Sequence, residues 1–262
     1  MQRYLNLYGY FVNQRFKILM EYRLNFFIGA ISTMVQQGAS IAAIWVVMRQ
    51  IPGLNGWNIY EVWLIYGLLT LGQSITHMFA DNLWTIGWGY IRSGDFDRFM
   101  VRPINPLFHL LADRFCHDGI GHFLTGAVLV GYSMNALHIA LTPLRALYLV
   151  SAVLSGGMIF IALNLITATS AFFIVESIPV TQIVFNFHEF AKYPLSIYHW
   201  TIRLLLTWII PYGFVSFYPA SYLLGRDVGW LAWVGPLVGV TFLMIAYRVW
   251  SFGLRHYSST GS

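Results

Sequence analysis

The sequence predicts an all-α integral membrane protein with six transmembrane helices. Of its 262 residues, 58% are apolar and 10% are charged, a composition outside the range of soluble domains. The charges lie almost entirely between long apolar runs. Crossing the roughly 30 Å hydrocarbon core takes about 20 apolar residues at 1.5 Å each. Six runs are long enough or nearly so: Leu24–Met48, Tyr60–Ala80, Gly119–Leu141, Ala146–Val175, Leu204–Tyr222 and Gly229–Trp250.

The basic residues predict the orientation of these spans. With the N-terminus inside, the inner gaps receive twelve Lys and Arg residues, and the outer gaps receive only Arg49, Arg145 and Arg226. This asymmetry fits the positive-inside rule with both termini cytoplasmic, and an odd number of spans would weaken it. The net charge of +5 indicates contact with anionic membrane lipids rather than with nucleic acid.

The chain predicts a single transmembrane domain over residues 1–257, followed by a small polar tail, 258–262, to which no function is assigned. The gap Asp81–Asp118, which the orientation places in the cytoplasm, could hold a short pair of helices but no independent core. Residues 1–22 and Ile178–Trp200 have apolar and polar residues on opposite helical sides, which predicts two helices lying on the inner membrane surface. Cys116, the single cysteine, excludes an intramolecular disulfide.

Two of the predicted spans stand out, one by its length and the other by the spacing of its glycines. The run Ala146–Val175 is longer than the bilayer core requires, so we expect it to tilt, to protrude or to break at Gly156-Gly157. Gly235 and Gly239 have the spacing of a GxxxG motif, which predicts close helix packing, either within the chain or between subunits.

No catalytic residue is predicted in this chain. A phosphate-binding P-loop needs a glycine before its lysine, whereas Lys17 and Lys192 follow Phe and Ala. His188-Glu189 begins like a zinc-protease helix, but Lys192 stands where the second histidine ligand would be.

The remaining histidines leave two alternatives open. Metal ligands could come from a helix face bearing Asp113, His117, Asp118 and His122, with Cys116 beside them. Haem ligands could come from His77, His122 and His138. We favour the explanation that these residues form a polar helix end at the inner interface, so no metal site is predicted. A membrane-embedded haem or metal redox protein stays an alternative.

The predicted spans contain almost no ionisable residue away from their ends. Gradient-driven carriers usually keep such groups deep in the bilayer. Their scarcity here favours a transporter that takes its energy from another source, and a gradient-driven carrier is kept as the other alternative. Neutral polar residues remain as candidates for a transport pathway, although bonding between helices would equally explain them. They are Gln36, Gln37, Gln73, Thr76, Asn164 and Thr167.

The gap after the second predicted span contains the most distinctive stretch. Ser93-Gly94-Asp95 is a turn and helix-start signal, and Pro103 ends the short helix that follows. We expect this helix to expose Phe96, Phe99 and Met100, which favours a protein partner or, alternatively, contact with lipid headgroups.

This stretch, from Gly94-Asp95-Phe96-Asp97 to Val101-Arg102-Pro103, resembles the coupling segment of ABC-2 type permeases, the six-helix membrane subunits of bacterial ABC exporters. The later half resembles one branch of that family. The motifs that carry this second likeness are Phe190-Ala191-Lys192-Tyr193-Pro194, Ile210-Pro211, Tyr218-Pro219-Ala220 and Leu223-Leu224-Gly225.

The resemblance implies a permease in the bacterial inner membrane that exports its substrate together with separate ATP-binding cassette subunits. Those partners would bind ATP and Mg, and a second permease, identical or different, would complete the pathway. The coupling residues implied are Gly94, Asp95, Phe96, Asp97, Arg98, Phe99, Met100, Arg102 and Pro103. Phe96 and Phe99 would be the apolar anchors in the ATPase groove.

Many permeases of this family have a helical hairpin between the last two spans on the outer side. Here the gap Leu223–Val228 is too short for one. Trp208–Tyr222 would therefore have to dip into the membrane and return, which stays open as an alternative to a full span.

Overall fold

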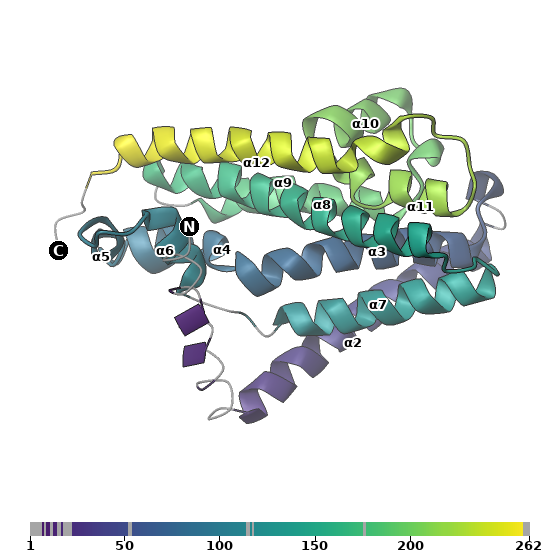
Figure 1. Cartoon of the computed structure of the whole chain (residues 1–262), viewed down its shortest axis with the longest axis horizontal. Helices are drawn as coiled ribbons and strands as arrows, with labels where there is room; N and C mark the ends of the chain where they lie inside the picture. Colours follow the sequence, from purple (N-terminus) through teal and green to yellow (C-terminus); the bar gives the residue numbers. More distant parts are fainter. Residues whose placement is uncertain are drawn as a thin grey trace.

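The computed structural model describes residues 7, 9, 10, 13, 14, 17, 23–51, 54–113, 116, 118–174 and 177–258. In these residues every regular element is helical, and the long helices run along the length of one bundle (Figure 1). The all-α prediction is confirmed. The predicted surface helix over residues 1–22 lies mostly outside the described residues, and so does most of the polar tail.

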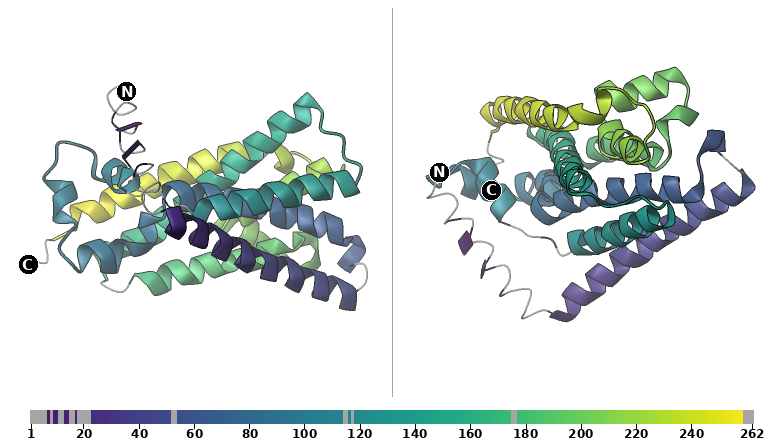
Figure 2. Two further views of the ribbon diagram at one scale, coloured as in Figure 1. Left: turned by 90° about the horizontal axis from the view of Figure 1, so that it is seen from below. Right: turned by 45° about the vertical axis from the view of Figure 1, so that its right-hand side comes forward.

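The long helices agree with five of the six predicted runs to within a few residues. Three segments, Phe26–Gln50, Pro143–Phe172 and Leu231–Arg255, are long and apolar enough to cross a membrane, so the chain is a multi-pass membrane protein. The long helices are α2 (Arg23–Gln50), α3 (Ile59–Phe79), α7 (Asp118–Ala136), α8 (Pro143–Ala168) and α12 (Leu231–Arg255). Helix α8 continues into a 3₁₀ turn, η3 (Thr169–Phe172), and α2 lies obliquely against α7 (Figure 2).

Glycines let the helices approach α3 closely on two sides. A Cβ atom at Gly126 of α7 would lie 2.9 Å from Leu71 Cγ and 3.1 Å from the Gly67 carbonyl oxygen of α3. On the other side, a Cβ at Gly157 of α8 would lie 2.7 Å from Ile75 Cδ1. Small residues at such contacts permit tight packing without a hydrophobic driving force. Helix α8 is continuous here, so the alternative of a break at Gly156-Gly157 is wrong.

The GxxxG motif of α12 packs within the chain. A Cβ at Gly235 would lie 3.2 Å from Ser155 Oγ, and one at Gly239 would lie 3.1 Å from Met158 Cβ, both on α8. The motif therefore joins α12 to α8.

The gap between α3 and α7 holds four short helices at one end of the bundle, beside the C-terminal end of α12 (Figure 1). We call this end the α5 end. The opposite end, where Glu61 opens α3, is called the Glu61 end. The four helices are α4 (Asn82–Thr85), the π-helix η2 (Ile86–Ile91), α5 (Asp97–Met100) and α6 (Pro106–Ala112).

Residues 178–197 run from the α5 end to the Glu61 end. They form α9 (Ile178–Asn186) and two 3₁₀ helices, η4 (Phe187–Lys192) and η5 (Leu195–Ile197). The Phe185 ring lies 4.8 Å from the Trp84 ring in α4, whereas Ser196 Oγ accepts a 2.9 Å hydrogen bond from Trp57 Nε1 at the Glu61 end. The predicted surface helix over Ile178–Trp200 is therefore wrong. Its polar residues Gln182, Asn186 and Glu189 are exposed and line a cleft that α2 and α3 also border.

The segment predicted as a fifth span, Leu204–Tyr222, is a hairpin. Helices α10 (Trp200–Leu204) and η6 (Leu205–Ile209) lead inward, and η7 (Tyr212–Phe214) and α11 (Phe217–Leu223) lead back at a bend of 79°. Pro211 lies at the bend, where its ring and missing N–H prevent a continuous helix.

Both ends of this hairpin lie at the Glu61 end. Arg203 Nη2 donates to the Ser196 carbonyl oxygen at 3.3 Å, and Arg226 Nη2 lies 2.9 Å from Glu61 Oε1. Every residue from 210 to 221 is buried, so this part of the apolar run is core, whereas Leu204, Trp208 and Ile209 are exposed. The structure thus favours the dipping alternative over the predicted full span.

Candidate functional site

A polar cleft of about 460 Å³ lies between α2, α3 and the α9–η4 segment. Each of these elements contributes polar residues spaced by one or two helical turns, the spacing of one helical face. The lining residues are Thr33, Gln36, Gln37, Ser40, Gln73, His77, Asp81, Trp84, His122, Gln182, Phe185, Asn186, His188, Glu189 and Lys192.

The cleft reaches the middle of the bundle. Lys192 Nζ lies 3.5 Å from Ser40 Oγ, and Ser40 is ten residues from the end of α2 at Gln50. At 1.5 Å per residue this is about 15 Å, half of the hydrocarbon core. The predicted spans themselves contribute almost no ionisable group here, but residues 178–197, which were not predicted as a span, bring His188, Glu189 and Lys192 beside α2 and α3.

These three groups form one cluster around the carboxylate of Glu189. Glu189 Oε1 lies 2.6 Å from Lys192 Nζ and 3.1 Å from His188 Nε2. The Glu189 side chain is 55% exposed, compared with 12% for Lys192 and 11% for His188. The carboxylate is thus the most exposed of the three groups, and the two basic side chains beside it are largely buried.

Amide groups line the cleft beside this cluster. Gln37 accepts a hydrogen bond from the Tyr66 hydroxyl, and Gln182 Nε2 donates to Asn186 Oδ1 at 2.8 Å. Gln73 lines the same cleft and is only 7% exposed. Its amide borders the cleft, where water or a ligand can form hydrogen bonds with it.

Three of the six predicted pathway residues, Gln36, Gln37 and Gln73, meet at this cleft, whereas Thr76, Asn164 and Thr167 do not. Thr167 Oγ1 donates back to the Leu163 carbonyl oxygen of its own helix, and Thr76 and Asn164 are buried.

Sequence reasoning missed the roles of His188, Glu189 and Lys192. The signal that could have found them is the polar stripe Gln182, Asn186 and Glu189 on a segment long enough to cross a membrane.

The predicted coupling segment lies at the α5 end, but its aromatic residues point into the protein. Phe96 and Phe99 are both fully buried. The Phe96 ring lies 5.3 Å from Phe172 and 5.0 Å from Tyr257. The prediction that Phe96 and Phe99 are exposed anchors is therefore wrong, because the ends of α8 and α12 bring their own aromatic residues to cover them.

Met100 and Val101 are the exposed apolar residues of this segment, at 44% and 81%. The rest of its surface is largely polar. The other exposed residues are Arg92, Ser93, Asp95, Arg98, Arg102 and Pro103, while Gly94 and Asp97 are half-buried.

Polar contacts fix the segment on its neighbours. The Tyr257 hydroxyl donates to Asp97 Oδ1 at 2.8 Å, and burial together with this bond raises the pKa of Tyr257 to about 12. Arg102 Nη1 lies 3.0 Å from His109 Nε2. Burial, and then the nearby Arg102 charge, lower the pKa of His109, so a neutral imidazole accepts this bond.

The histidines do not form the arrangement that a haem would need. His77 and His122 stack directly on each other with centroids 4.6 Å apart, and His138 follows the opposite end of α7. In the described ranges, no three His, Cys, Asp or Glu side chains group as metal ligands would. His117, one of the predicted candidates, lies outside those ranges, and Asp113 Oδ2 lies 3.2 Å from Arg98 Nη2.

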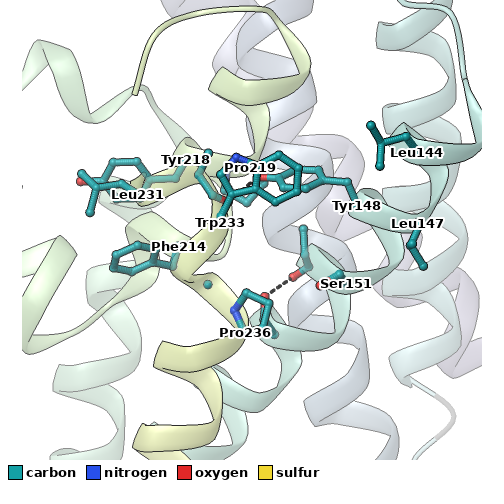
Figure 3. A pocket seen from close by; sticks show the side chains of 14 residues that line it. Leu144, Leu147, Tyr148, Ser151, Phe214, Tyr218, Pro219, Leu231, Trp233 and Pro236 are labelled. Atoms are coloured by element: carbon teal, nitrogen blue, oxygen red, sulfur yellow. Dashed lines mark hydrogen bonds between the residues drawn. The ribbon is translucent and has the colours of Figure 1, made fainter. Parts of the chain in front are cut away.

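A second, apolar pocket lies between α8, α11 and α12 (Figure 3). Pro236 has no N–H for the Ala232 carbonyl oxygen one turn earlier, and the Tyr148 hydroxyl donates to that oxygen at 2.7 Å instead. Tyr148 and Trp233 pack at 5.1 Å across the pocket. The Tyr148 hydroxyl is thus already used within the protein, and most of the other lining residues are apolar.

A family model described as "ABC-2 family transporter protein" matches residues 34–261, which include the segment at the α5 end and every lining residue of the cleft except Thr33. No curated protein matched the chain, and no solved structure matched it.

Proposed function

The chain belongs to the ABC-2 transporter family, and on that premise we propose that it is the permease subunit of an ATP-driven bacterial exporter. The observation that carries the proposal is the polar cleft at mid-bundle depth. Ionisable groups inside a membrane face protein or water rather than lipid, because their desolvation costs several kcal/mol. The exposed Glu189 carboxylate therefore indicates a water-filled pathway.

A second permease, identical or different, would close this pathway. Glu189 and Gln36 are exposed on one side of this chain, and lipid tails could not satisfy their polar atoms. A second six-helix subunit opposite α2 and α9 would enclose them. The six spans of this proposal are α2, α3, α7, α8, the segment 178–197 and α12, with the hairpin 200–223 entering from the outer side.

The proposed orientation places the α5 end in the cytoplasm of a bacterium and both termini on that side of its inner membrane. Arg203 now belongs to the outer side, and Lys192 lies inside the bundle. Ten basic residues then remain inside against four outside, which still follows the positive-inside rule.

Energy would come from separate ATP-binding cassette subunits that bind ATP and Mg, so we propose that this chain itself is not an enzyme. The docking surface proposed for them is the α5 segment. Met100 and Val101 are its apolar contacts, and Arg92, Asp95 and Arg102 surround them with charge. The buried Phe96 and Phe99 hold this surface in place and do not touch the partner.

Replacing Met100 and Val101 together by alanine should release the ATPase or uncouple hydrolysis from transport. Truncating apolar anchors at the centre of an interface commonly costs about 2 kcal/mol, which corresponds to more than about tenfold weaker binding. ATPase co-purification, substrate-stimulated hydrolysis and native mass spectrometry of the complex measure the effect. The unaltered complex should contain two permease chains and two ATPases.

A matched control is Leu144→Ala with Leu147→Ala, two exposed leucines on α8 near the opposite end. This control should keep the ATPase. Full retention of both co-purification and hydrolysis in the Met100 and Val101 variant would refute the docking surface, and an active chain that never binds an ATPase would refute the exporter.

A gradient-driven carrier remains the second candidate, because His188, Glu189 and Lys192 are ionisable groups at mid-depth, the kind that proton relays use. The two candidates differ in one measurement. A carrier would transport when the purified chain alone is placed in proteoliposomes with a proton gradient, whereas the proposed permease would require its ATPases and ATP.

A further inference from the structure

The accessible charge of the cleft is negative. Besides three histidines, its titratable lining residues are Asp81, Glu189 and Lys192, so two carboxylates stand against one ammonium. Lys192 and Glu189 also differ in access, because the Lys192 side chain is 12% exposed and that of Glu189 is 55% exposed. A ligand that enters the cleft therefore meets the carboxylate first.

The Lys192 ammonium has other partners within reach. It lies 3.5 Å from Ser40 Oγ and 5.6 Å from the centre of the Tyr66 ring. The hydroxyl can accept a hydrogen bond, and the ring face attracts a cation. If a second cation took its place beside Glu189, Lys192 could move toward these groups without being left as an isolated buried charge.

Apolar and amide groups complete the surroundings of the carboxylate. The rings of Trp84 and Phe185 line the cleft and pack edge to face at 4.8 Å. The Gln73 amide lines it as well. A cleft that contains both aromatic rings and a carboxylate suits a cation that bears apolar substituents better than a small hydrated ion.

We propose that the cleft binds an organic cation with apolar substituents against the Glu189 carboxylate, and that the ligand displaces the Lys192 ammonium, which acts as a tethered competitor. The inference rests on the proposed permease function, since it names the class of substrate that the pathway would accept. It predicts opposite effects for the two charged residues: loss of the Glu189 carboxylate weakens ligand binding, and loss of the Lys192 ammonium strengthens it.

The test uses two probes of nearly the same size and shape and of opposite charge, tetraphenylphosphonium and tetraphenylborate. Equilibrium binding of each is measured on the purified complex that contains the full chain. Tetraphenylphosphonium should bind more tightly than tetraphenylborate. Glu189→Gln should weaken tetraphenylphosphonium binding about tenfold or more, as expected for losing a close charge pair, whereas Lys192→Met should strengthen it several-fold.

Asp227→Asn is the matched control, because this exposed acid lies in the loop after α11, away from the cleft, and its removal should leave binding unchanged. The proposal is overturned if tetraphenylborate binds better, if tetraphenylphosphonium does not bind, or if Lys192→Met weakens binding. Glu189→Gln without effect would overturn it too.

These outcomes are separable from failure of the proposed function. If the ATPases co-purify but the charge preference is absent, only the substrate class is wrong. If the predicted charge preference appears in a chain that never binds an ATPase, the site stands and the exporter proposal fails.

Discussion

Replacing Phe96 by alanine is expected to destabilise the protein by about 3–5 kcal/mol, the usual cost of removing a fully buried aromatic side chain. Phe96 is 0% exposed and contacts Phe172, Trp250 and Tyr257. These residues come from the ends of α8 and α12, so the cavity would lie where the α5 segment is attached to the bundle. Thermal unfolding of the purified variant in detergent measures the loss.

Met100→Ala is the control for this variant, because Met100 lies four residues further along the same segment and is 44% exposed. We expect it to change the free energy of unfolding by less than about 1 kcal/mol. Equal stability of the Phe96 and Met100 variants would mean that Phe96 is not buried in the bundle, and that its side chain is free to contact a partner after all.

Gly126→Ala should destabilise the protein by about 1–3 kcal/mol through overpacking. The new methyl group would lie 3.0 Å from the Leu71 backbone nitrogen and 3.1 Å from the Gly67 carbonyl oxygen. Both neighbours are backbone atoms of α3, so the contact can be relieved only by moving α7 away from α3. Thermal unfolding again provides the measurement.

Helix α7 supplies its own control, since a Cβ at Gly131 would meet nothing within 4 Å. Gly131→Ala should be neutral or stabilising by up to about 1 kcal/mol, because alanine has the higher helix propensity. If both alanine variants behaved alike, the close approach of α7 to α3 would be contradicted.

The sequence predicted the long helices well because hydropathy and length decide them. Helices α2, α3, α7, α8 and α12 follow the predicted apolar runs to within a few residues. The surface helix predicted over 178–200 was wrong, and the choice between a span and a hairpin for the run 204–222 was left open, for the same physical reason. Hydropathy measures how apolar a segment is, and it cannot tell whether its polar side meets water, headgroups or an internal cleft.

Segment 178–197 looked like a surface helix because Gln182, Asn186 and Glu189 form a polar stripe, yet that stripe lines the cleft. The hairpin 200–223 looked like a span because it is apolar, yet its residues 210–221 are buried among other helices. A single sequence carries little information about such packing partners.

The candidate site was predicted in part for the same reason. Gln36, Gln37 and Gln73 were found because polar residues inside apolar runs are conspicuous. Glu189 and Lys192 were missed because their segment was placed on the surface. The anchors of the α5 segment were misassigned because the aromatic residues that cover Phe96, such as Trp250 and Tyr257, are more than 150 positions away in the sequence and meet it only in the folded chain.

The central claim, that residues 178–197 cross the membrane and line a pathway, is tested most directly by which side of the membrane His199 faces. His199 is exposed and follows that segment. In a Cys116→Ser background, a membrane-impermeant maleimide should label the His199→Cys variant in intact cells. The exposed Ser93 at the α5 end provides the comparison, and its cysteine variant should react only after permeabilisation. Labelling of the His199→Cys variant only after permeabilisation would contradict the account, since the segment, its cleft and the proposed pathway could not then span the bilayer.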